Sequence, residues 1–147
     1  MPILEELERS KNETVPYFDL PDEDLDKTYA PGKWTIREIL HHLTDAETVL
    51  YDRIRRIISE PKTVIWSFNQ DLWATNLSYL SLPLEASKDV YVSVRRMIML
   101  QAELHYASQG HLEFVHSETG LHTLKDEFDK VVWHNDNHLK QIRKALV

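Results

Sequence analysis

Two histidines stand four residues apart near the end of this chain, in the segment Trp133-His-Asn-Asp-Asn-His138. On an α-helix, side chains at positions i and i+4 lie on the same side with Cβ atoms roughly 6 Å apart. His134 and His138 are therefore placed to share one metal ion. Pairs at this spacing also arise by chance as exposed or hydrogen-bonded side chains, so a metal site requires a third ligand from elsewhere in the chain.

Two adjacent histidines in an earlier segment are the candidates for that third ligand. His41 and His42 point about 100° apart on a helix, so only one of them can face a site shared with His134 and His138. On the helical wheel, His42 lies at the border of the apolar stripe, whereas His41 falls opposite the stripe, toward solvent. The pattern therefore favours His42 as the ligand.

The composition narrows the classes of function. Cysteine is absent, which excludes disulfides and thiolate ligands and leaves eight histidines as the soft metal ligands. With 24 acidic against 17 basic residues, the formal charge of −7 disfavours binding to nucleic acids and anionic membranes. No apolar stretch approaches the ~20 residues that a membrane helix needs, and the acidic N-terminus differs from a basic secretory signal. We therefore expect a cytoplasmic protein with neither nucleic acid nor membrane as a partner.

The apolar pattern predicts an all-α protein, with residues 1–147 forming a single domain. Only three glycines occur, fewer than a protein with many tight β-turns needs. Long helices are expected over about residues 2–15, 35–59, 84–107 and 121–146, and the second begins with a capping box, Thr35-Ile-Arg-Glu38. A short turn is expected at residues 21–25, and a short helix around 69–79 within an aromatic-rich segment. The architecture is a four-helix bundle with one long crossover between the second and third helices.

The same patterns predict which faces of the helices are buried. On the third helix, the inner side is expected to carry Val90, Val94, Met97, Ile98, Gln101 and Leu104. Near the start of the fourth helix, Asp126, Glu127 and Asp129 are expected to form a solvated face that suits the helix dipole, with a supporting role at the site left open for Glu127. Trp73 is a candidate for the wall of a substrate pocket, although such aromatic residues more often pack in the core.

Two stretches of the chain resemble the motifs of one known family. The run Pro31-Gly-Lys-Trp-Thr-Ile-Arg-Glu-Ile-Leu-His-His-Leu-Thr-Asp-Ala-Glu47 is similar to the start of the second helix in DinB-like proteins, including the YfiT-like branch. The segment His134-x-x-x-His138-x-x-Gln141-Ile142 resembles the terminal motif of that family. The resemblance implies an up-down-down-up four-helix bundle with a three-histidine metal site near one end, often in a homodimer.

Carried over by motif, the metal ligands are His42, His134 and His138. The second histidine at position 41 departs from the commonest family pattern and leaves an exchange of roles between His41 and His42 open. Three neutral imidazoles suit several divalent ions: zinc or nickel first, with manganese, iron or cobalt as alternatives. Gln141 and Asp45 are candidates to orient ligand histidines through the second ring nitrogen.

The expected function is that of a divalent-metal-dependent enzyme with a small-molecule substrate. Resemblance to the YfiT-like branch favours a thiol S-transferase that activates a low-molecular-weight thiol at the metal. The alternative within enzymes is a hydrolase that uses metal-bound hydroxide. An alternative of another class is a non-enzymatic, stress-associated binding protein with a structural metal. Structural sites normally have four protein ligands, and the three visible here favour an enzyme with open coordination positions.

Overall fold

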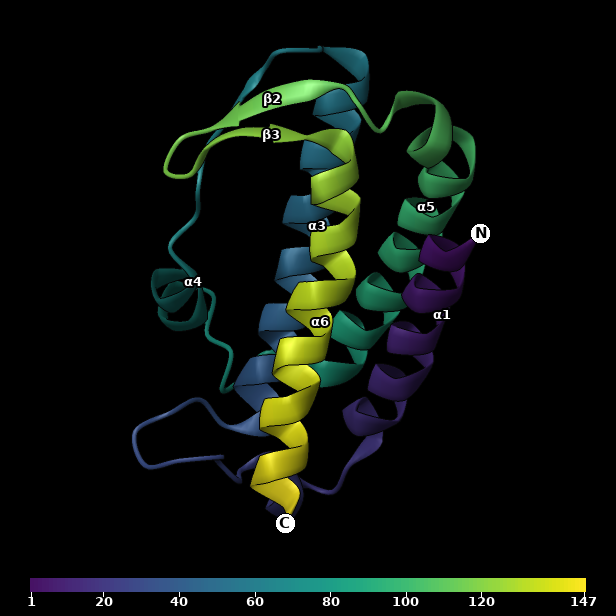
Figure 1. The fold of residues 1–147 in the computed structure, drawn as a ribbon. Helices are drawn as coiled ribbons and strands as arrows, with labels where there is room; N and C mark the ends of the chain where they lie inside the picture. Colours follow the sequence, from purple (N-terminus) through teal and green to yellow (C-terminus); the bar gives the residue numbers. More distant parts are fainter.

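Four long helices form the body of the protein in a computed structural model that describes residues 1–147 (Figure 1). They are α1 (Pro2–Thr14), α3 (Ile36–Ser59), α5 (Leu84–Gln109) and α6 (Leu124–Leu146). In Figure 1, α3 and α5 run in one direction, whereas α1 and α6 run in the opposite direction. The chain must return along the bundle between α3 and α5. The predicted all-α class, the up-down-down-up order and the long crossover are confirmed.

Local sequence sets the start of the two helices that carry the histidines. The Thr35 side chain accepts a hydrogen bond from the Glu38 amide, and the Glu38 carboxylate accepts one from the Thr35 amide. Thr123 and Asp126 form the same reciprocal pair at the start of α6. Each pair satisfies backbone N–H groups that have no partner within the first helical turn. Both helices therefore begin at a defined residue.

The sequence patterns do not predict a small sheet that covers one end of the bundle. Strand β1 (Val64–Ile65) pairs in parallel with β2 (Glu113–His116), which pairs antiparallel with β3 (Gly120–Thr123). Gly120 has φ +85°, a left-handed conformation that glycine adopts readily, at the turn into β3. Because β3 takes up residues 120–123, α6 begins at Leu124 and not at the expected Leu121.

Shorter helices occupy the connections. Between α1 and α3 lie a 3₁₀ helix, η1 (Val15–Asp19), and α2 (Asp22–Leu25), which falls on the expected short turn. The crossover contains α4 (Gln70–Asn76), capped by the Asn69 side chain, which accepts a hydrogen bond from the Leu72 amide. No helix has both the length and the apolar composition that crossing a bilayer requires.

The buried face of α5 matches the predicted one only in part, since Ile98 is buried and Val94 is half-buried against the core as expected. Val90, Met97 and Leu104, expected on the inner side, are 42%, 39% and 66% exposed. The apolar pattern misplaces part of the face because the inner side of α5 carries polar residues that are paired within the core. The residues that are buried there are Leu84, Ser87, Tyr91, Arg95, Ile98 and Ala102.

Candidate metal centre

Three histidine side chains converge between α3 and α6. His42 comes from the second turn of α3, and His134 and His138 come from consecutive turns of α6. Their ligand nitrogens all lie within 4.8 Å of one another, and the Nε2 atoms of His42 and His134 are 3.0 Å apart. The structure thus brings together the three histidines that the two sequence motifs single out.

Burial keeps these imidazoles in the neutral form that binds metal ions. Loss of hydration, followed by the neighbouring His134 and His138 rings, lowers the pKa of His42 to about 2. Burial, followed by the His138 ring and more distant cations, lowers the pKa of His134 to about 3. Burial also lowers the pKa of His138, against the opposing effect of a hydrogen bond with Gln141. At neutral pH all three rings retain a lone pair for a ligand bond.

The geometry fits a divalent transition metal. Imidazole nitrogens bind such ions at about 2.0–2.1 Å, so two nitrogens on one ion lie at most about 4.2 Å apart. The spacing of 3.0 Å between the Nε2 atoms of His42 and His134 falls within that limit, and the bound of 4.8 Å on the whole set exceeds it by about 0.6 Å at most, so an ion would draw the rings together by no more than that. The buried Nδ1 of His42 has no hydrogen-bond partner, so the polar contact of this ring is with the cluster alone. An ion among the rings would give the facing nitrogens, which include the Nε2 atoms of His42 and His134, a partner for their lone pairs.

Gln141 contacts the side of His138 that faces away from the cluster. The His138 Nδ1–H donates to the Gln141 Oε1 at 2.7 Å, which leaves Nε2 with the lone pair. The Gln141 Nε2 in turn donates to the hydroxyl of Tyr29, in the loop before α3, at 3.3 Å. This chain of contacts fixes the amide orientation, the histidine tautomer and the direction of the ring.

Replacing Gln141 with leucine is therefore expected to weaken metal binding by about 10- to 100-fold while leaving one site per chain. The loss follows from the free rotation and tautomerism of His138 without its acceptor. Competition with a chromophoric chelator measures the affinity, and Gln101→Leu on α5 is the matched control. An unchanged affinity in Gln141→Leu would show that the contact has no orienting effect.

Asp45 does not contact a ligand histidine, although it lies one turn beyond His42. Its carboxylate accepts a hydrogen bond from the hydroxyl of Tyr79, at the end of the crossover. Burial raises the pKa of Asp45, and the Tyr79 hydrogen bond opposes this effect. The orienting role expected for Asp45 is therefore replaced by attachment of the crossover to α3.

His41 is buried, and the predicted orientation toward solvent is wrong. Only 1% of the residue is exposed, because the start of α5 covers this side of α3. The His41 Nδ1 accepts from the Ser87 hydroxyl at 2.6 Å, and Nε2 donates to the Leu82 carbonyl at 3.0 Å. Both ring nitrogens are thus occupied away from the cluster, which leaves His42 as the histidine of this pair that faces it.

Aromatic side chains shield the cluster. The Trp34 ring centroid lies 4.9 Å from that of His42 and 6.5 Å from that of His138, and Phe68 stacks 6.3 Å from His42. Trp73 packs on Phe68 at 4.8 Å and so lies behind this first aromatic layer. It lines a pocket of about 560 Å³ beside β1 that none of the three histidines reaches. Phe68 lies outside any periodic segment, which is why sequence reasoning misses it.

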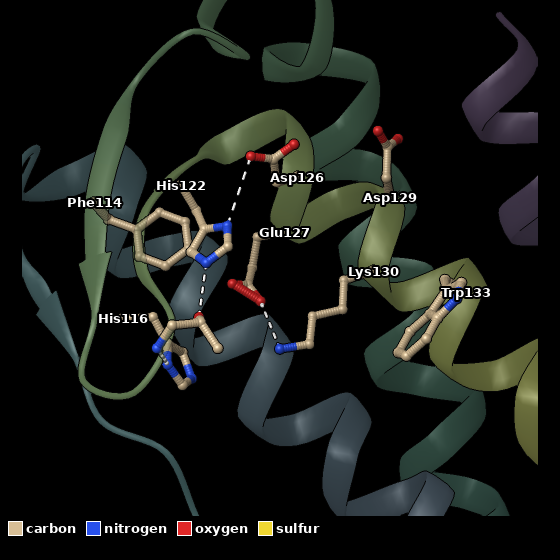
Figure 2. A pocket seen from close by; sticks show the side chains of 9 residues that line it. Phe114, His116, His122, Asp126, Glu127, Asp129, Lys130 and Trp133 are labelled. Carbon is tan, nitrogen blue, oxygen red and sulfur yellow. Dashed lines mark hydrogen bonds and ion pairs between the residues drawn. The ribbon is translucent and has the colours of Figure 1, made fainter.

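Glu127, two turns before His134 on α6, does not belong to the expected solvated face. It is 2% exposed, whereas the neighbouring Asp126 is exposed. The β2–β3 hairpin lies over this part of α6 and places His116 near Glu127 (Figure 2). The prediction fails for Glu127 because the sequence patterns do not reveal the hairpin.

An ion pair in the core connects three of the long helices. Arg95 on α5 is fully buried and pairs through two nitrogens with the Glu47 carboxylate on α3. Its third nitrogen donates to the Leu7 carbonyl and the Ser10 hydroxyl on α1, both at 2.8 Å. All parts of the guanidinium group thus have acceptors, as a buried charge requires.

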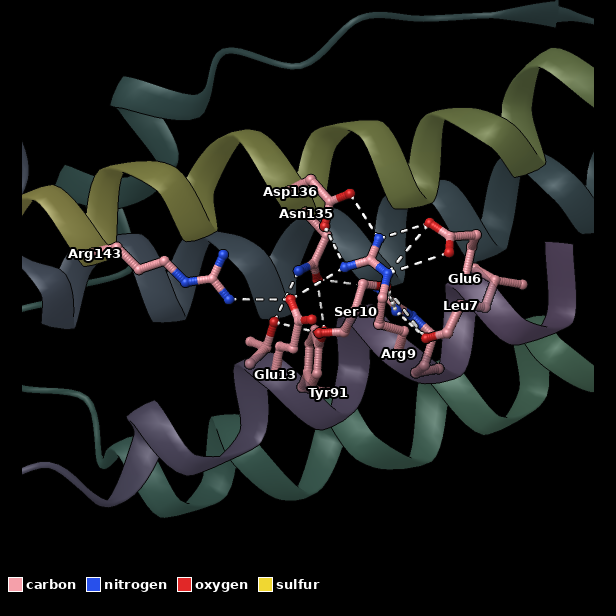
Figure 3. A network of polar contacts seen from close by, with 11 residues as sticks. Glu6, Leu7, Arg9, Ser10, Glu13, Tyr91, Asn135, Asp136 and Arg143 are labelled. Carbon is pink, nitrogen blue, oxygen red and sulfur yellow. Dashed lines mark hydrogen bonds and ion pairs between the residues drawn. The ribbon is translucent and has the colours of Figure 1, made fainter. Parts of the chain in front are cut away.

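The same network holds α6 through the residue next to His134. The Asn135 Oδ1 accepts from the Tyr91 hydroxyl at 2.6 Å and from Arg95 at 3.1 Å (Figure 3). Its Nδ2 donates to the Thr14 hydroxyl at 2.8 Å. With the amide fixed from both sides, the rotation of α6 about its axis is set, and so is the direction in which His134 points.

A four-helix bundle in which buried imidazoles from two helices converge on one point defines a class of helical metal-binding proteins. Within that class, the chain belongs to the DinB superfamily, whose family model matches residues 6–142. The match includes α3, most of α6 and all three histidines. The family resemblance of the two sequence motifs is thereby confirmed.

Comparison with individual proteins agrees with this assignment. Two proteins of Oceanobacillus iheyensis are 31% and 30% identical over 140 and 127 residues, which are 95% and 86% of this chain and 79% and 73% of theirs. Their names assign them provisionally to the metal-dependent hydrolases. YfiT from Bacillus subtilis, described as a probable metal-dependent hydrolase with an unusual four-helix bundle topology, matches with a TM-score of 0.90 at 21% identity. The match covers 98% of this chain and 83% of YfiT, and it shows the common fold.

Proposed function

We propose that this protein is a divalent-metal-dependent thiol S-transferase that joins a low-molecular-weight thiol to a small electrophilic substrate. The proposed ligands of the ion are His42, His134 and His138. The cluster of three imidazoles supports a reaction at the ion, because no fourth protein ligand is among its members and coordination positions stay open. A bound ion would acidify a thiol and a water molecule alike. Hydrolysis also benefits from a free general base, and the nearby Asp45 is engaged by Tyr79, which favours the thiol.

His42, His134 and His138 would hold the ion as neutral imidazoles, so that its positive charge would favour the deprotonated form of a bound thiol near neutral pH. The chain itself contains no cysteine, so the thiol comes from a small molecule. The protein contributes fixed rings, the Gln141 hydrogen bond, and the wall of Trp34 and Phe68 that limits access of water. Zinc or nickel is the proposed ion, with manganese, iron or cobalt as alternatives.

The second candidate is a metal-dependent hydrolase in which the ion activates water. The names of the Oceanobacillus iheyensis relatives favour it. The two candidates share the ligands, the ion and the small-molecule class of substrate, and they differ in the nucleophile. They are therefore separated by the chemistry of the product.

The test is the conjugation of cysteine to monochlorobimane by protein loaded with each candidate metal in turn. We expect the fluorescent conjugate to form several-fold faster than without protein, and the rate to fall to the protein-free level on chelation and in His134→Ala. Hydrolysis of p-nitrophenyl acetate without thiol, in place of conjugation, would favour the hydrolase. Neither reaction with any of the metals would contradict both enzymatic proposals and favour the binding protein.

We further propose that the protein is a cytoplasmic homodimer that pairs through the exposed apolar row of α5. This row consists of Val90, Met97 and Leu104, which are 42%, 39% and 66% exposed. A spacing of seven residues places such side chains along one side of a helix, the pattern through which two helices pack together. A second copy offers the same row and is the occupant that the proposal commits to.

The double variant Met97→Glu/Leu104→Glu is expected to convert the dimer to a monomer, because pairing would bury charges without partners. Light scattering on a sizing column measures the mass, and the matched control is Leu80→Glu, at a residue 70% exposed in the crossover. A wild-type mass equal to the chain mass of 17.4 kDa would contradict the dimer. A double variant that keeps the wild-type mass would contradict this interface.

A further inference from the structure

A cavity lined mainly by polar side chains lies beside α6, away from the metal centre. It has a volume of about 500 Å³ and lies between the β2–β3 hairpin and the first half of α6 (Figure 2). Its deepest polar residue, Glu127, precedes His134 by seven residues, which is about 10 Å along the helix axis. None of the three clustered histidines lines this cavity. The cavity is therefore a separate site on the same helix.

The Glu127 carboxyl in this cavity has an incomplete environment. The residue is 2% exposed, and its Oε1 has no hydrogen-bond partner. The Arg53 Nη1 and the Lys130 Nζ each lie 3.8 Å from this oxygen, beyond hydrogen-bond distance. Figure 2 shows the carboxyl directed into the space between His116 and Lys130. A buried polar atom without a partner points to a group that completes its hydrogen bonding.

The charges around Glu127 determine which chemical group of a ligand can bind next to its carboxyl. A ligand atom that bridges this gap donates a hydrogen bond to Oε1 and accepts one from Lys130, the cation that lines the cavity. A hydroxyl does both, whereas an ammonium group has no acceptor and a carboxylate has no donor. An ammonium group would also lie against two cations, and a carboxylate would lie against Glu127. The site therefore favours a neutral hydroxyl.

The rest of the lining fits a hydroxyl-bearing carbon skeleton. Phe114 forms an apolar wall, and Trp133, 63% exposed, stands at the rim. The other two carboxylates of the lining are occupied, since Asp129 accepts from Tyr106 and Asp126 caps α6. Apolar walls with a few oriented polar groups are typical of pockets for small molecules.

We propose that this cavity binds a neutral, polyhydroxylated small molecule of the sugar or polyol type, with Glu127 as the hydroxyl acceptor and Lys130 as the donor. Trp133 covers the apolar side of the bound molecule. The site does not depend on the ion for any of its contacts, so its test is independent of the proposed reaction.

Titration of the ¹⁵N-labelled, zinc-loaded protein with methyl β-D-glucopyranoside and with myo-inositol tests the proposal by NMR. We expect saturable shifts at the Glu127 and Lys130 amides and at the Trp133 indole, with a Kd on the order of 1–10 mM. Ethylammonium and acetate, as small ions of either charge, are expected to bind at least about tenfold more weakly. If neither hydroxyl probe shifts these resonances, or if an ion binds as tightly, the proposed class of ligand is wrong.

Variants test the assignment of the polar groups. Glu127→Leu is expected to weaken probe binding about tenfold or more, whereas Glu103→Gln, at an exposed glutamate on α5, leaves it unchanged. Lys130→Met removes a donor from the rim and is expected to weaken binding as well, which provides a test should Glu127→Leu not fold. Wild-type affinity in either cavity variant overturns the assignment. Shifts that persist in both show only adsorption elsewhere.

Discussion

The variant His134→Ala is expected to lose metal binding, with the metal occupancy falling from one ion per chain to below detection. Loss of one ligand leaves two, and two imidazoles hold a divalent ion far more weakly than three. The loss of metal affinity should exceed the 10- to 100-fold loss that is expected when the hydrogen-bond partner of a ligand histidine, such as Gln141, is removed. Elemental analysis after dialysis gives the occupancy, and chelator competition gives the affinity. His42→Ala should behave in the same way.

Two histidine variants serve as controls for this result. His105→Ala, on α5 and outside the cluster, should keep full occupancy. His41→Gln should also keep it, because both nitrogens of His41 are hydrogen-bonded to Ser87 and Leu82. Full occupancy in His42→Ala together with loss in His41→Gln would transfer the role to His41. Full occupancy in His134→Ala would contradict the proposed metal centre.

Removing the charge of Arg95 is expected to give the largest loss of stability. Arg95→Met leaves the Glu47 carboxylate buried without its partner and leaves Asn135 with one hydrogen bond fewer. Breaking a buried ion pair from one side costs about 3–5 kcal/mol, a large part of the total of about 5–15 kcal/mol for a folded domain. Urea unfolding followed by circular dichroism measures the change.

A double variant distinguishes the cost of an unpaired charge from the cost of lost packing. Arg95→Met/Glu47→Leu removes both charges and should recover most of the stability, because apolar residues of similar volume often replace a buried pair without loss. Arg96→Met, at the exposed neighbouring position, should lie within about 0.5 kcal/mol of the wild type. A loss below about 1 kcal/mol in Arg95→Met would show that water or other groups compensate Glu47.

Local and periodic signals predict the parts of the structure that local interactions determine. The helix over residues 36–59 follows from its spacing of apolar residues and from the Thr35–Glu38 capping box. The i, i+4 spacing of His134 and His138 places both rings on one side of α6, and the helical wheel separates His42 from His41. The meeting of α3 with α6 at these rings follows from the family motifs and not from any local signal.

The remaining features depend on contacts between distant segments. The strands β1, β2 and β3 have two to four residues each, too few for a period-two alternation to be recognised. Because the sequence patterns do not reveal that sheet, they predict that Glu127 is exposed to solvent. The inner face of α5 contains Arg95, whose burial depends on Glu47 of another helix, so a search for apolar residues includes Ile98 but also selects the exposed Met97 and Leu104. His41 is misplaced because the start of α5 packs over it.

The metal-binding histidines and the aromatic residues around them come from different parts of the fold, and this has an evolutionary consequence. The three imidazoles are carried by the rigid helices α3 and α6, whereas Phe68 and Tyr79 belong to the crossover and Trp34 to the loop before α3. Substitutions in these connections can reshape the surroundings of the reactive position while the ligand geometry persists. Descendants of one ancestral bundle can thus diversify in what they recognise through changes in two connecting segments, while the four long helices are kept.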